Sequence, residues 1–560
     1  MSNERKIAQL EAEIKLLKDT VDTNKAELNR WKELYFSLRH SKYASQSERE
    51  DPNQLNFFNE LEDSLTQGVV EDMTPAENAE EMKTKVNSYI RVKSTKKTMK
   101  APQDTPVSDV YHHAEETPLC EECGSEKEIV SYLVQESITF IPSSYVIVRH
   151  HYPQYRCTVC APDTGEYKKQ TIYSQNILEK TICDPSLLAT IIDEKMRFGL
   201  PLYRLEQRFK LDNGCCISRK TASAWMMFAF RQLTGLIDAM ERALRKSIHW
   251  NMDETGLKIV KGTQTNSRSA RNCHMIVRAA TNEDGSRGPI VFTFSEHKKD
   301  NDFIQLIGDY SGIIQSDGLE GYENARKVCN FTHLGCLIHS RRKAKDILNI
   351  NKKSVLAKEL IALYGSIFHE EGILIDDFKK GLLTPDEFLV KRRTTLTPLF
   401  DNLKDWLVIH QPFALKKSKI ATAINYPLKR WDTLVRFLDY PFATSTNQRA
   451  ELTIKPFALG RKNFLFSYTP LGAQASALYY SLIETCKVMN IDTVQYLTFL
   501  FSHAKGLESE AQWDAMLPWN VDLQETQKYL ETLKKAVPDK KRTDPYILRG
   551  KHPKKTSKSS

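Results

Sequence analysis

The sequence predicts a multidomain α+β protein, and three observations indicate this fold class. Apolar residues follow a heptad repeat near the N-terminus, two Cys-x-x-Cys pairs flank a stretch rich in β-branched and aromatic residues, and strand-like segments after Ser247 alternate with helical ones. At roughly 150 residues per domain, 560 residues suffice for three or four folded units. We therefore analyse the chain as a series of separate units.

Composition excludes several classes of protein. Hydrophobic residues make up 41% and charged residues 27%, which is ordinary for globular proteins and unlike disordered, collagenous or membrane-embedded chains. No run approaches the roughly 18 apolar residues of a spanning helix, and the N-terminus lacks an apolar signal core. We therefore expect no membrane partner and a cytoplasmic location.

Charge is uneven along the chain. The formal net charge is +9, and residues 534–560 hold ten Lys or Arg against two Asp, which gives +8. We assign residues 501–560 to a C-terminal region with a basic tail. This tail is either a solvated, mobile end or an arm that contacts nucleic-acid phosphates.

Residues 1–50 are predicted to form a coiled coil. Asn24 is the polar residue of the seam and would fix register at a cost in stability. We expect a homo-oligomer through this helix, and the alternative is a long helix packed on its own protein. Residues 51–109, first acidic and then basic, are interpreted as a linker. The seam follows alternating steps of three and four: Ile7, Leu10, Ile14, Leu17, Val21, Asn24, Leu28, Trp31, Tyr35 and Leu38.

Residues 110–175 are predicted to be a zinc-binding module. Cys120, Cys123, Cys157 and Cys160 bracket a strand-rich ribbon at 129–156, and four thiolates supply the tetrahedral ligands of a structural zinc site. The 33 residues between the pairs exceed the usual spacing of about 15 to 20. Buried free cysteines and a redox pair are the alternatives. Such a site has no open coordination position, so its role would be structural or DNA-binding.

Residues 176–246 have a helical pattern that resembles a helix-turn-helix unit. Ser218 is positioned to cap a helix that presents Arg219 and Lys220 in its first turn. The first residues of a recognition helix enter the major groove of double-stranded DNA. Any capped three-helix unit would look similar, and this alternative stays open.

After residue 247 the elements alternate in the order βββαβαβ, which is that of a ribonuclease H-like core. Residues 247–342 form its first part. Strands are expected at 249–256, 273–281, 289–295, 313–318 and 334–338, and helices at 302–309 and 322–328.

Asp253 and Asp317 are the first two candidate catalytic residues. In this order of elements the first and fourth strands are neighbours, so two acids 64 residues apart would lie about 5 Å from each other. Carboxylates that close suit Mg²⁺ or Mn²⁺, and two such ions about 4 Å apart can activate an attacking oxygen and stabilise a leaving one. For either acid alone, a strand-end cap is the plain alternative.

Glu451 is the third candidate. Ser445 and Gln448 have capping-box spacing, so a helix is expected to begin at Ser445 and to carry Glu451 until Pro456 interferes. Asn447 lies four residues before Glu451 and shares its face. The alternative is a surface Glu on a short amphipathic helix. We assign 440–500 to the second part of the core.

A basic and aromatic run follows Glu451. Lys455, Arg461 and Lys462 are interleaved with aromatic side chains, a composition suited to phosphates and unstacked bases. The alternative is a strand or loop that packs its aromatic residues inward. The aromatic members are Phe457, Phe464, Phe466 and Tyr468.

Several of these segments together resemble the large transposase of the insertion sequence 66 family. They are Asp253-Glu254-Thr255, Ser316-Asp317-Gly318 with Tyr322, the stretch from Cys336 to Lys343, and above all Asn447 to Ser467, which ends in Leu-Gly-Arg-Lys-Asn-Phe-Leu-Phe-Ser. The Tyr480 to Lys487 helix and the N-terminal modules fit the same resemblance, which covers nearly the whole chain. Asn213-Gly-Cys-Cys216 departs from the pattern ahead of the expected recognition helix.

The resemblance implies roles for specific residues. Asp253, Asp317 and Glu451 would be the acidic triad of a DDE transposase that uses two Mg²⁺ or Mn²⁺ ions, and 343–439 would be its helical insertion. The Cys-x-x-His element and its neighbours would support the active site, although a core Cys and a partner His remain the alternative. These supporting residues are Cys336, His339, Arg341 and Asn447.

The expected function is transposition of a bacterial insertion sequence, by cleavage of element ends and strand transfer to target DNA. Accessory proteins encoded by the element are expected partners, and the location is expected to be the nucleoid. Two alternatives remain: a non-catalytic DNA-binding or regulatory protein on a decayed core, and a nuclease of the same fold without strand transfer.

Overall fold

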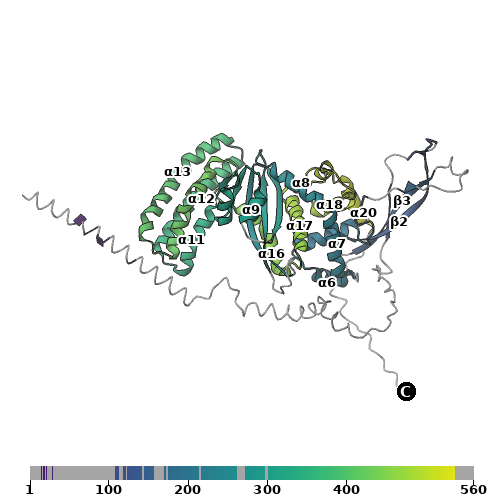
Figure 1. Cartoon of the computed structure of the whole chain (residues 1–560), viewed down its shortest axis with the longest axis horizontal. Coiled ribbons are helices and arrows are strands. Elements are labelled where there is room, and N and C mark those ends of the chain that lie inside the picture. The colour runs from purple at the N-terminus through teal and green to yellow at the C-terminus, as the bar shows by residue number, and fades with distance from the viewer. Residues whose placement is uncertain are drawn as a thin grey trace, which may run out of the picture. The chain divides into compact units, whose positions relative to one another are not determined.

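The computed structural model describes residues 107–112, 118–121, 123–141, 144–156, 170–171, 175–213, 216–260, 271–296 and 300–536. It also describes seven residues near the N-terminus. The chain divides into two compact units. One, called here the helical unit, holds Met1–Thr98, Ser340–Leu382 and Val390–Lys429; the other, the sheet unit, holds Met99–His339, Leu383–Leu389 and Arg430–Ser560 (Figure 1).

A five-stranded mixed sheet lies at the centre of the sheet unit. Its strands are β5 (His249–Ile259), β6 (Arg271–Thr281), β7 (Arg287–Ser295), β8 (Ile313–Gln315) and β9 (Thr332–Leu334), in the spatial order β7-β6-β5-β8-β9. β5, β6 and β7 are antiparallel, whereas β8 is parallel to both β5 and β9. With α9 (Asp300–Ile307) and α10 (Glu320–Arg326), the predicted βββαβαβ order and the predicted neighbourhood of the first and fourth strands are confirmed.

The fifth strand was predicted too late in the chain. β9 ends at Leu334, and α11 (Leu337–Ile350) has already begun where the strand was expected. The chain leaves the sheet at Gly335, whose N–H donates to the Thr433 carbonyl at 2.9 Å. The Cys336 sulfur accepts backbone hydrogen bonds from the first turn of α11, which is how a helix N-cap works. Leu337 and Ile338, two apolar residues in the first turn of α11, were therefore wrongly predicted to end the strand.

Helices cover both faces of this sheet (Figure 1). α17 (Pro470–Val488) packs on β7, where the Ser481 hydroxyl accepts the Phe292 N–H at 2.8 Å. α16 (Gln448–Phe464) packs on β5 and β6, and its Phe457 ring lies 5.3 Å from the ring of Tyr480. α8 (Thr234–Arg245) also packs on β7. The apolar side chains of these elements form one continuous core, which is what fixes the strands that carry the candidate acids.

The segment before the sheet contains the expected ribbon. β2 (Glu128–Ile141) pairs antiparallel with β3 (Ser144–Arg156), and β4 (Gln170–Thr171) adds to β3. β1 (Val107–Tyr111) runs parallel to β3, so the last three residues of the predicted linker lie in a strand instead. The alternating pattern Val-Ser-Asp-Val-Tyr suits that pairing. The rest of the predicted linker lies outside the described residues.

A helical group joins the ribbon to the sheet. It consists of α5 (Pro185–Met196), α6 (Leu202–Asn213) and α7 (Arg219–Gln232), followed by α8. The predicted Ser218 cap is confirmed, because the Ser218 hydroxyl accepts the Thr221 N–H at 3.1 Å. Trp225 and Phe230 of α7 are buried in the common core. α18 (Thr493–His503), α19 (Glu510–Ala515) and α20 (Gln524–Lys535) complete the sheet unit.

Residues 343–439 are helical, as predicted. α12 (Val355–Lys379), most of α13 (Pro385–His410), a 3₁₀ turn η2 (Gln411–Phe413) and α14 (Lys419–Lys429) belong to the helical unit, where buried Arg392 lies 3.8 Å from buried Glu371. α15 (Trp431–Val435) and η3 (Arg436–Asp439) belong to the sheet unit. Across the described part of the chain, we find no helix with the length and apolarity needed to span a membrane.

The described N-terminal residues are helical, as the heptad predicts. Four of them, Ile14, Leu17, Val21 and Leu28, belong to the predicted seam and are more than half exposed. The remaining seam residues, including Asn24, lie outside the described residues. Self-association through this seam therefore stays a prediction.

Candidate active site

Asp253 lies within β5, and Asp317 lies in the turn directly after the neighbouring strand β8. β5 and β8 are parallel, and Asn251 lies opposite Gln315 in their register. Asp253 and Asp317 each follow that pair by two residues, so both lie on the same side of it. The Leu319 N–H donates to the Asp317 carboxylate at 3.0 Å, which orients this side chain where the chain leaves β8.

Asp253 lies in a field of like charges. Burial, and after it the charges of Glu254, Asp317 and Glu451, together raise its pKa to about 7. Three elements, β5, the turn after β8 and α16, thus bring four carboxyl groups within electrostatic reach of one another. We call Asp253, Glu254, Asp317 and Glu451 the acidic cluster.

Glu451 reaches this cluster from the first turn of α16, but the predicted cap is wrong. α16 begins at Gln448, with Asn447 rather than Ser445 as its N-cap, and the Glu451 N–H bonds to the Asn447 carbonyl at 3.3 Å. Ser445 is held elsewhere, because its carbonyl accepts the Leu337 N–H at 2.8 Å. Tertiary hydrogen bonds therefore override the local capping signal.

Pro456 does not end α16, which continues to Phe464. A proline removes one helical N–H and crowds the preceding turn, at a typical cost of about 3 kcal/mol. Ile454 and Phe457 on either side of it are buried against the sheet. Burying each of these two side chains stabilises the fold by about 1.5–3 kcal/mol, which offsets the cost of the proline. The helix that carries Glu451 is therefore longer than the sequence predicts.

A buried amide network lies directly behind the acidic cluster. The Asn251 side-chain NH₂ donates to the side-chain oxygens of Gln315 and Asn447, both at 3.1 Å. The Asn447 NH₂ donates to the Met252 carbonyl at 2.7 Å. The Gln315 NH₂ donates to the carbonyls of Gly335 and Thr444 at 3.1 and 2.7 Å. Because the three amides come from β5, β8 and the start of α16, they fix the elements that carry Asp253, Asp317 and Glu451 relative to one another.

Tyr322 supports the cluster from α10. Its hydroxyl donates to the Glu254 carboxylate at 3.1 Å, and its side chain is fully buried. Burial, together with the charges of Glu254, Asp317 and Asp253, holds the pKa of Tyr322 well above its usual value. The phenol therefore stays protonated and orients Glu254.

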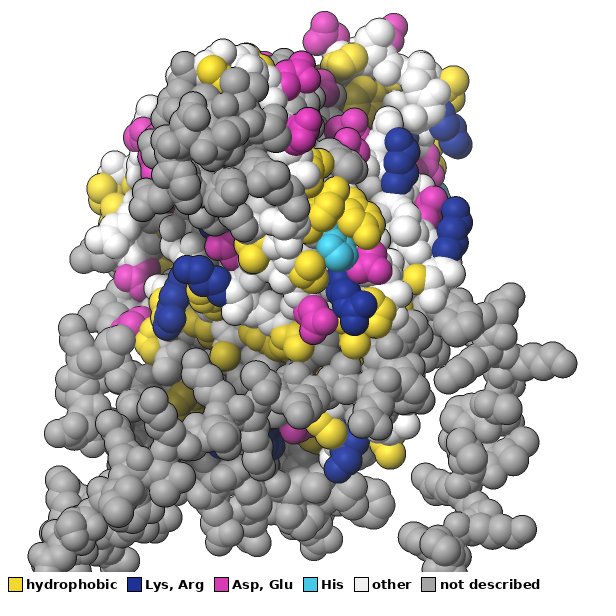
Figure 2. Space-filling model, turned by 90° about the vertical axis from the view of Figure 1, so that its right-hand side faces the viewer, with side chains coloured by type: hydrophobic (Ala, Val, Ile, Leu, Met, Phe, Trp, Pro, Cys, Tyr) yellow, Lys and Arg dark blue, Asp and Glu magenta, His cyan; other side chains and the backbone are white. Residues whose placement is uncertain are grey.

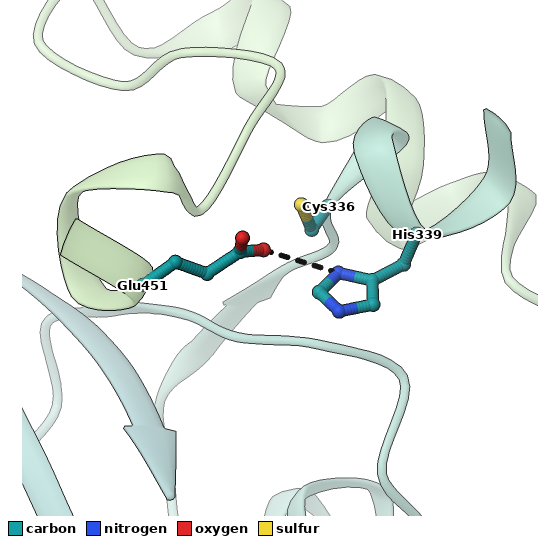
Figure 3. A group of neighbouring side chains, drawn as sticks. All are labelled: Cys336, His339 and Glu451. Carbon is teal, nitrogen blue, oxygen red and sulfur yellow. Dashed lines mark ion pairs between the residues drawn. The ribbon is translucent and has the colours of Figure 1, made fainter. Parts of the chain in front are cut away.

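Cys336 and His339 lie beside Glu451 (Figure 3). The His339 Nδ1 is 3.7 Å from a Glu451 oxygen, and the Asn447 N–H donates to the Cys336 sulfur at 3.1 Å. Burial raises the pKa of the Cys336 thiol to about 11. Arg341, the remaining predicted supporting residue, belongs to the helical unit, where its guanidinium lies over the Phe368 ring at 5.7 Å.

The predicted DNA-contacting run after Glu451 lies partly in α16 and partly in the segment that follows α16 and pairs with β5. Lys455 and Lys462 are exposed on α16, whereas the Arg461 guanidinium donates to the Gly256 carbonyl of β5. Phe457 is buried, so the inward-packing alternative holds for that residue. Phe466 and Tyr468 are 41% and 43% exposed, where a base could stack on them. After α16 the chain adds to β5, since the Ser467 N–H donates to the Lys258 carbonyl at 3.0 Å.

The remaining predicted DNA contacts lie at the start of α7. Lys220 is exposed and Arg219 partly so. On the face drawn in Figure 2, the Lys and Arg side chains of the described residues stand in separate groups among acidic and apolar ones. Among the described residues of this face, positive charge is therefore arranged in local groups.

The predicted zinc ligands are only partly described. Cys120 and Cys123 lie in a tight turn, closed by the Gly124 N–H that donates to the Cys120 carbonyl at 2.9 Å. Leu119 and Glu126 pair across this turn. Cys157 and Cys160 lie outside the described residues, so the four-cysteine site stays a prediction.

Sequence reasoning missed four residues of this region: Glu254, Tyr322 as its partner, and the amides Asn251 and Gln315. A signal for the amides was present. Side chains alternate along a strand, so a residue two positions before another shares its face. Asn251 and Gln315 each stand two positions before a candidate acid inside an apolar strand, and a polar residue there predicts a buried hydrogen-bond partner.

The acidic cluster fits a hard divalent cation. Mg²⁺ and Mn²⁺ prefer carboxylate oxygen, and after burial the charges of Glu254, Asp317 and Glu451 contribute to the raised pKa of Asp253. Asp253, Asp317 and Glu451 are the residues that could hold such ions. A cation there would favour the ionised form of every member of the cluster.

The chain is similar to one described family and to several known proteins. The family described as "Transposase IS66 family" matches residues 180–475, and its "IS66 C-terminal element" matches residues 481–519. Three proteins of Sinorhizobium fredii (strain NBRC 101917 / NGR234) are similar over most of their length. "Uncharacterized protein y4hP" is 26% identical over 82% of both chains, and "Uncharacterized protein y4jD" is 25% identical over 75% of this chain and 81% of its own. "Uncharacterized protein y4qI" is 24% identical over 71% of this chain and 72% of its own.

Proposed function

Because the chain belongs to the IS66 family of transposases, we propose that it is a DDE-type enzyme that cleaves the ends of its insertion sequence and joins them to target DNA. The sheet order and the family match support a ribonuclease H-like catalytic core. Asp253, Asp317 and Glu451 are its acidic triad. The helical stretch 343–439 is an insertion between the second and third acids.

One observation carries this proposal. β5, the turn after β8 and α16 converge so that burial and the charges of Glu254, Asp317 and Glu451 together raise the pKa of Asp253 to about 7. Carboxyl groups gathered around an acid whose pKa is raised are typical of functional sites, and their oxygens suit a divalent cation.

The triad would hold two Mg²⁺ or Mn²⁺ ions, which supply an activated oxygen nucleophile and stabilise the leaving oxygen of a phosphodiester. The protein positions these groups. Asn251, Gln315 and Asn447 fix the strands and helix behind the acids, and Tyr322 orients Glu254. Exposed Lys455 and Lys462 on the same helix as Glu451 are suited to contact DNA phosphates.

Other parts of the chain serve binding and assembly. Arg219 and Lys220 contact element-end DNA from the start of α7, and a structural Zn²⁺ holds Cys120, Cys123, Cys157 and Cys160 together. The N-terminal seam joins copies of the chain. Accessory proteins encoded by the element take part, and the complex works at the bacterial nucleoid in the cytoplasm.

The test is cleavage of labelled element-end DNA in Mg²⁺ by the full-length protein. We expect Asp253→Asn, Asp317→Asn and Glu451→Gln to lose cleavage and to retain DNA binding. Asp284→Asn, which changes an exposed acid in the β6–β7 turn, is the matched control and should cleave like the parent. Cleavage that survives all three triad changes would contradict the proposal.

The same assay separates the alternatives. Joining of the cleaved end to a second DNA identifies a transposase, whereas cleavage without joining indicates a nuclease of this fold. Binding without cleavage by the parent, with accessory proteins supplied, would favour a regulatory DNA-binding protein.

A further inference from the structure

Three side chains of different chemistry converge beside the acidic cluster. The Cys336 sulfur, a His339 ring nitrogen and a Glu451 carboxylate oxygen all lie within 4.8 Å of one another (Figure 3). Cys336 precedes α11, His339 lies in its first turn, and Glu451 lies in the first turn of α16. We call these residues the thiol–imidazole group.

This donor set differs from that of the acidic cluster. Mg²⁺ takes oxygen ligands and avoids sulfur, whereas thiolate and imidazole select Zn²⁺ and related metals. Three protein ligands with a fourth position left open are typical of zinc sites that accept a water or an exogenous ligand. A structural four-cysteine site, as predicted at the N-terminal module, is a different kind of site.

The fold prepares these donors and leaves a route to them. The Cys336 sulfur is nearly inaccessible to water but accepts the Asn447 N–H at 3.1 Å, a contact that also suits a thiolate. The side chains of His339 and Glu451 are 18% and 28% exposed, so a cation can approach from their side. The negative charge of the acidic cluster attracts cations to the same place.

We propose that Cys336, His339 and Glu451 bind Zn²⁺, and that Zn²⁺ bound there inhibits the Mg²⁺-dependent reaction. The Cys336 S–H bond breaks as the sulfur–zinc bond forms, and the proton passes to the buffer. Glu451 belongs to both sites, so a carboxylate held by Zn²⁺ is withdrawn from the acidic cluster. The binding site stands on geometry alone, whereas the inhibition rests on the proposed function.

Zinc binding is tested on the full-length protein by counting Zn²⁺ equivalents retained after dialysis against a fixed free Zn²⁺ concentration. Cys336→Ser should retain one equivalent fewer than the parent, because serine keeps a capping oxygen but removes the thiolate. His339→Asn should show the same loss at a partly exposed position. Zn²⁺ bound by Cys120, Cys123, Cys157 and Cys160 is expected to be the same in the parent and the variants, so it does not affect the difference between them.

Cys329→Ser is the matched control, since Cys329 is a buried thiol of the same unit outside the group. It should retain as much Zn²⁺ as the parent. Thermal unfolding of each variant shows whether it is folded. Equal zinc content in the parent, Cys336→Ser and His339→Asn would overturn the site.

Inhibition is tested by adding Zn²⁺ to the Mg²⁺ cleavage assay. Cys336→Ser should need at least about tenfold more Zn²⁺ than the parent for half-inhibition, and Cys329→Ser should match the parent. Equal sensitivity of Cys336→Ser and the parent would overturn the inhibitory role. Absence of cleavage in every protein would count against both the proposed function and the inhibitory role, while the zinc count would still decide the site.

Discussion

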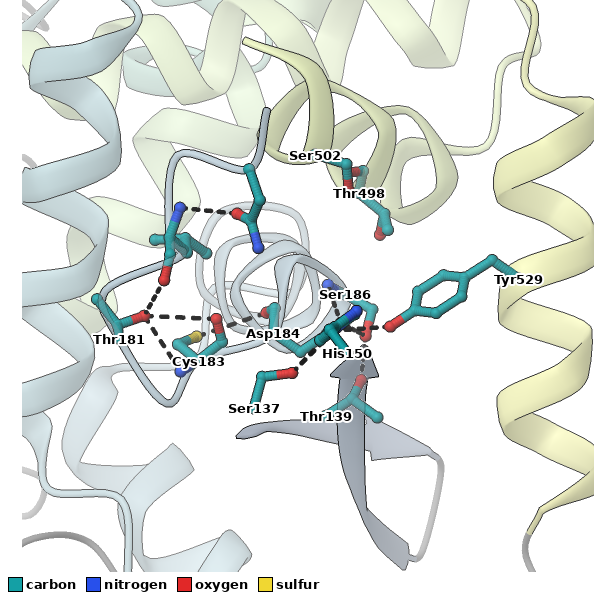
Figure 4. Close-up of polar contacts among 12 residues, drawn as sticks. Ser137, Thr139, His150, Thr181, Cys183, Asp184, Ser186, Thr498, Ser502 and Tyr529 are labelled. Atoms are coloured by element: carbon teal, nitrogen blue, oxygen red, sulfur yellow. Dashed lines mark hydrogen bonds and ion pairs between the residues drawn. The ribbon is translucent and has the colours of Figure 1, made fainter. Parts of the chain in front are cut away.

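Two largely buried aspartates of the sheet unit have opposite environments. Asp184 caps α5 and is fully buried, and it is surrounded by donors (Figure 4). The Tyr529 hydroxyl donates to it at 2.7 Å, the Ser186 hydroxyl at 2.6 Å, and His150 lies 3.4 Å away. Burial raises the pKa of Asp184, but His150, Ser186 and Tyr529 outweigh burial and hold the pKa below its usual value.

Asp253 is less completely buried and has the opposite pKa shift. Burial raises its pKa, and the neighbouring charges of Glu254, Asp317 and Glu451 add to burial instead of opposing it. One backbone N–H, that of Glu254, donates to the Asp253 carboxylate at 2.9 Å. The two buried acids therefore differ in the direction in which neighbouring groups shift their pKa, and this difference agrees with the proposed role of Asp253.

The two regions also differ in what they join. The Asp184 network ties the ribbon, α5 and α20 together through Ser137, His150 and Tyr529. Behind the acidic cluster, the amides of Asn251, Gln315 and Asn447 join β5, β8 and the start of α16. The Asp184 network serves stability and the acidic cluster is the proposed site of chemistry, so substitutions at the two sites should separate stability from activity.

The largest effect is expected at Asp253. Asp253→Asn removes one negative charge from the cluster and should lower cleavage of element-end DNA at least about a thousandfold, since a metal-binding carboxylate is lost. The variant should remain folded, as judged by circular dichroism and thermal unfolding. Normal cleavage would place Asp253 with the structural acids.

The second effect is on stability and lies at Asp184. Asp184→Ala strips a buried charge from His150 and Tyr529 and should lower the free energy of unfolding by about 3–5 kcal/mol. Asp492→Ala is the matched control, because Asp492 is an exposed N-cap whose carboxylate accepts the Gln495 N–H at 2.7 Å. It should cost only about 1 kcal/mol. If urea unfolding shows that Asp184→Ala and Asp492→Ala lower the free energy of unfolding equally, Asp184 is not a stabilising buried acid.

The third effect concerns the amide network. Asn447→Asp preserves the shape of the side chain but replaces its NH₂ donor by an acceptor facing the Met252 carbonyl. We expect cleavage to fall about a hundredfold, because Glu451 loses its fixed position relative to β5. Asn425→Asp, on α14 of the helical unit, is a control amide change. An unchanged rate in Asn447→Asp would show that the network does not position the acids.

The smallest effect is a pH dependence. The pKa of Asp253 is about 7 in the folded protein and 3.8 ordinarily, so the folded state holds this proton more tightly. The contribution of Asp253 to the free energy of unfolding is therefore greatest below pH 4, and it is lost as the pH rises towards 7. In buffer without Mg²⁺, Asp253→Asn should gain on the order of 2 kcal/mol over the parent between pH 5 and 8.

Mg²⁺ should remove this difference, since a bound cation favours the ionised carboxylate. Thermal unfolding at several pH values measures both effects. A difference between the two proteins that is constant with pH would show that Asp253 titrates in its ordinary range.

The sequence predicted the sheet and the strands that carry Asp253 and Asp317 because apolar alternation and turn residues are local signals. It misplaced β9 and the start of α16, where Cys336 and Ser445 are held by partners more than a hundred residues away. Its assignment of Asp253, Asp317 and Glu451 as catalytic acids stays a prediction, and it did not point to the amides behind them. Asn251, Gln315 and Asn447 have a shared role only once β5, β8 and α16 have come together.

The most direct test of the central claim is a count of bound Mn²⁺. Electron paramagnetic resonance of the full-length protein should show Mn²⁺ binding that Mg²⁺ displaces. Asp253→Asn, Asp317→Asn and Glu451→Gln should each weaken this binding at least about tenfold, and Asp284→Asn should not. Mn²⁺ binding that is equal in the parent and all three triad variants would contradict the assignment of these acids to one cation site.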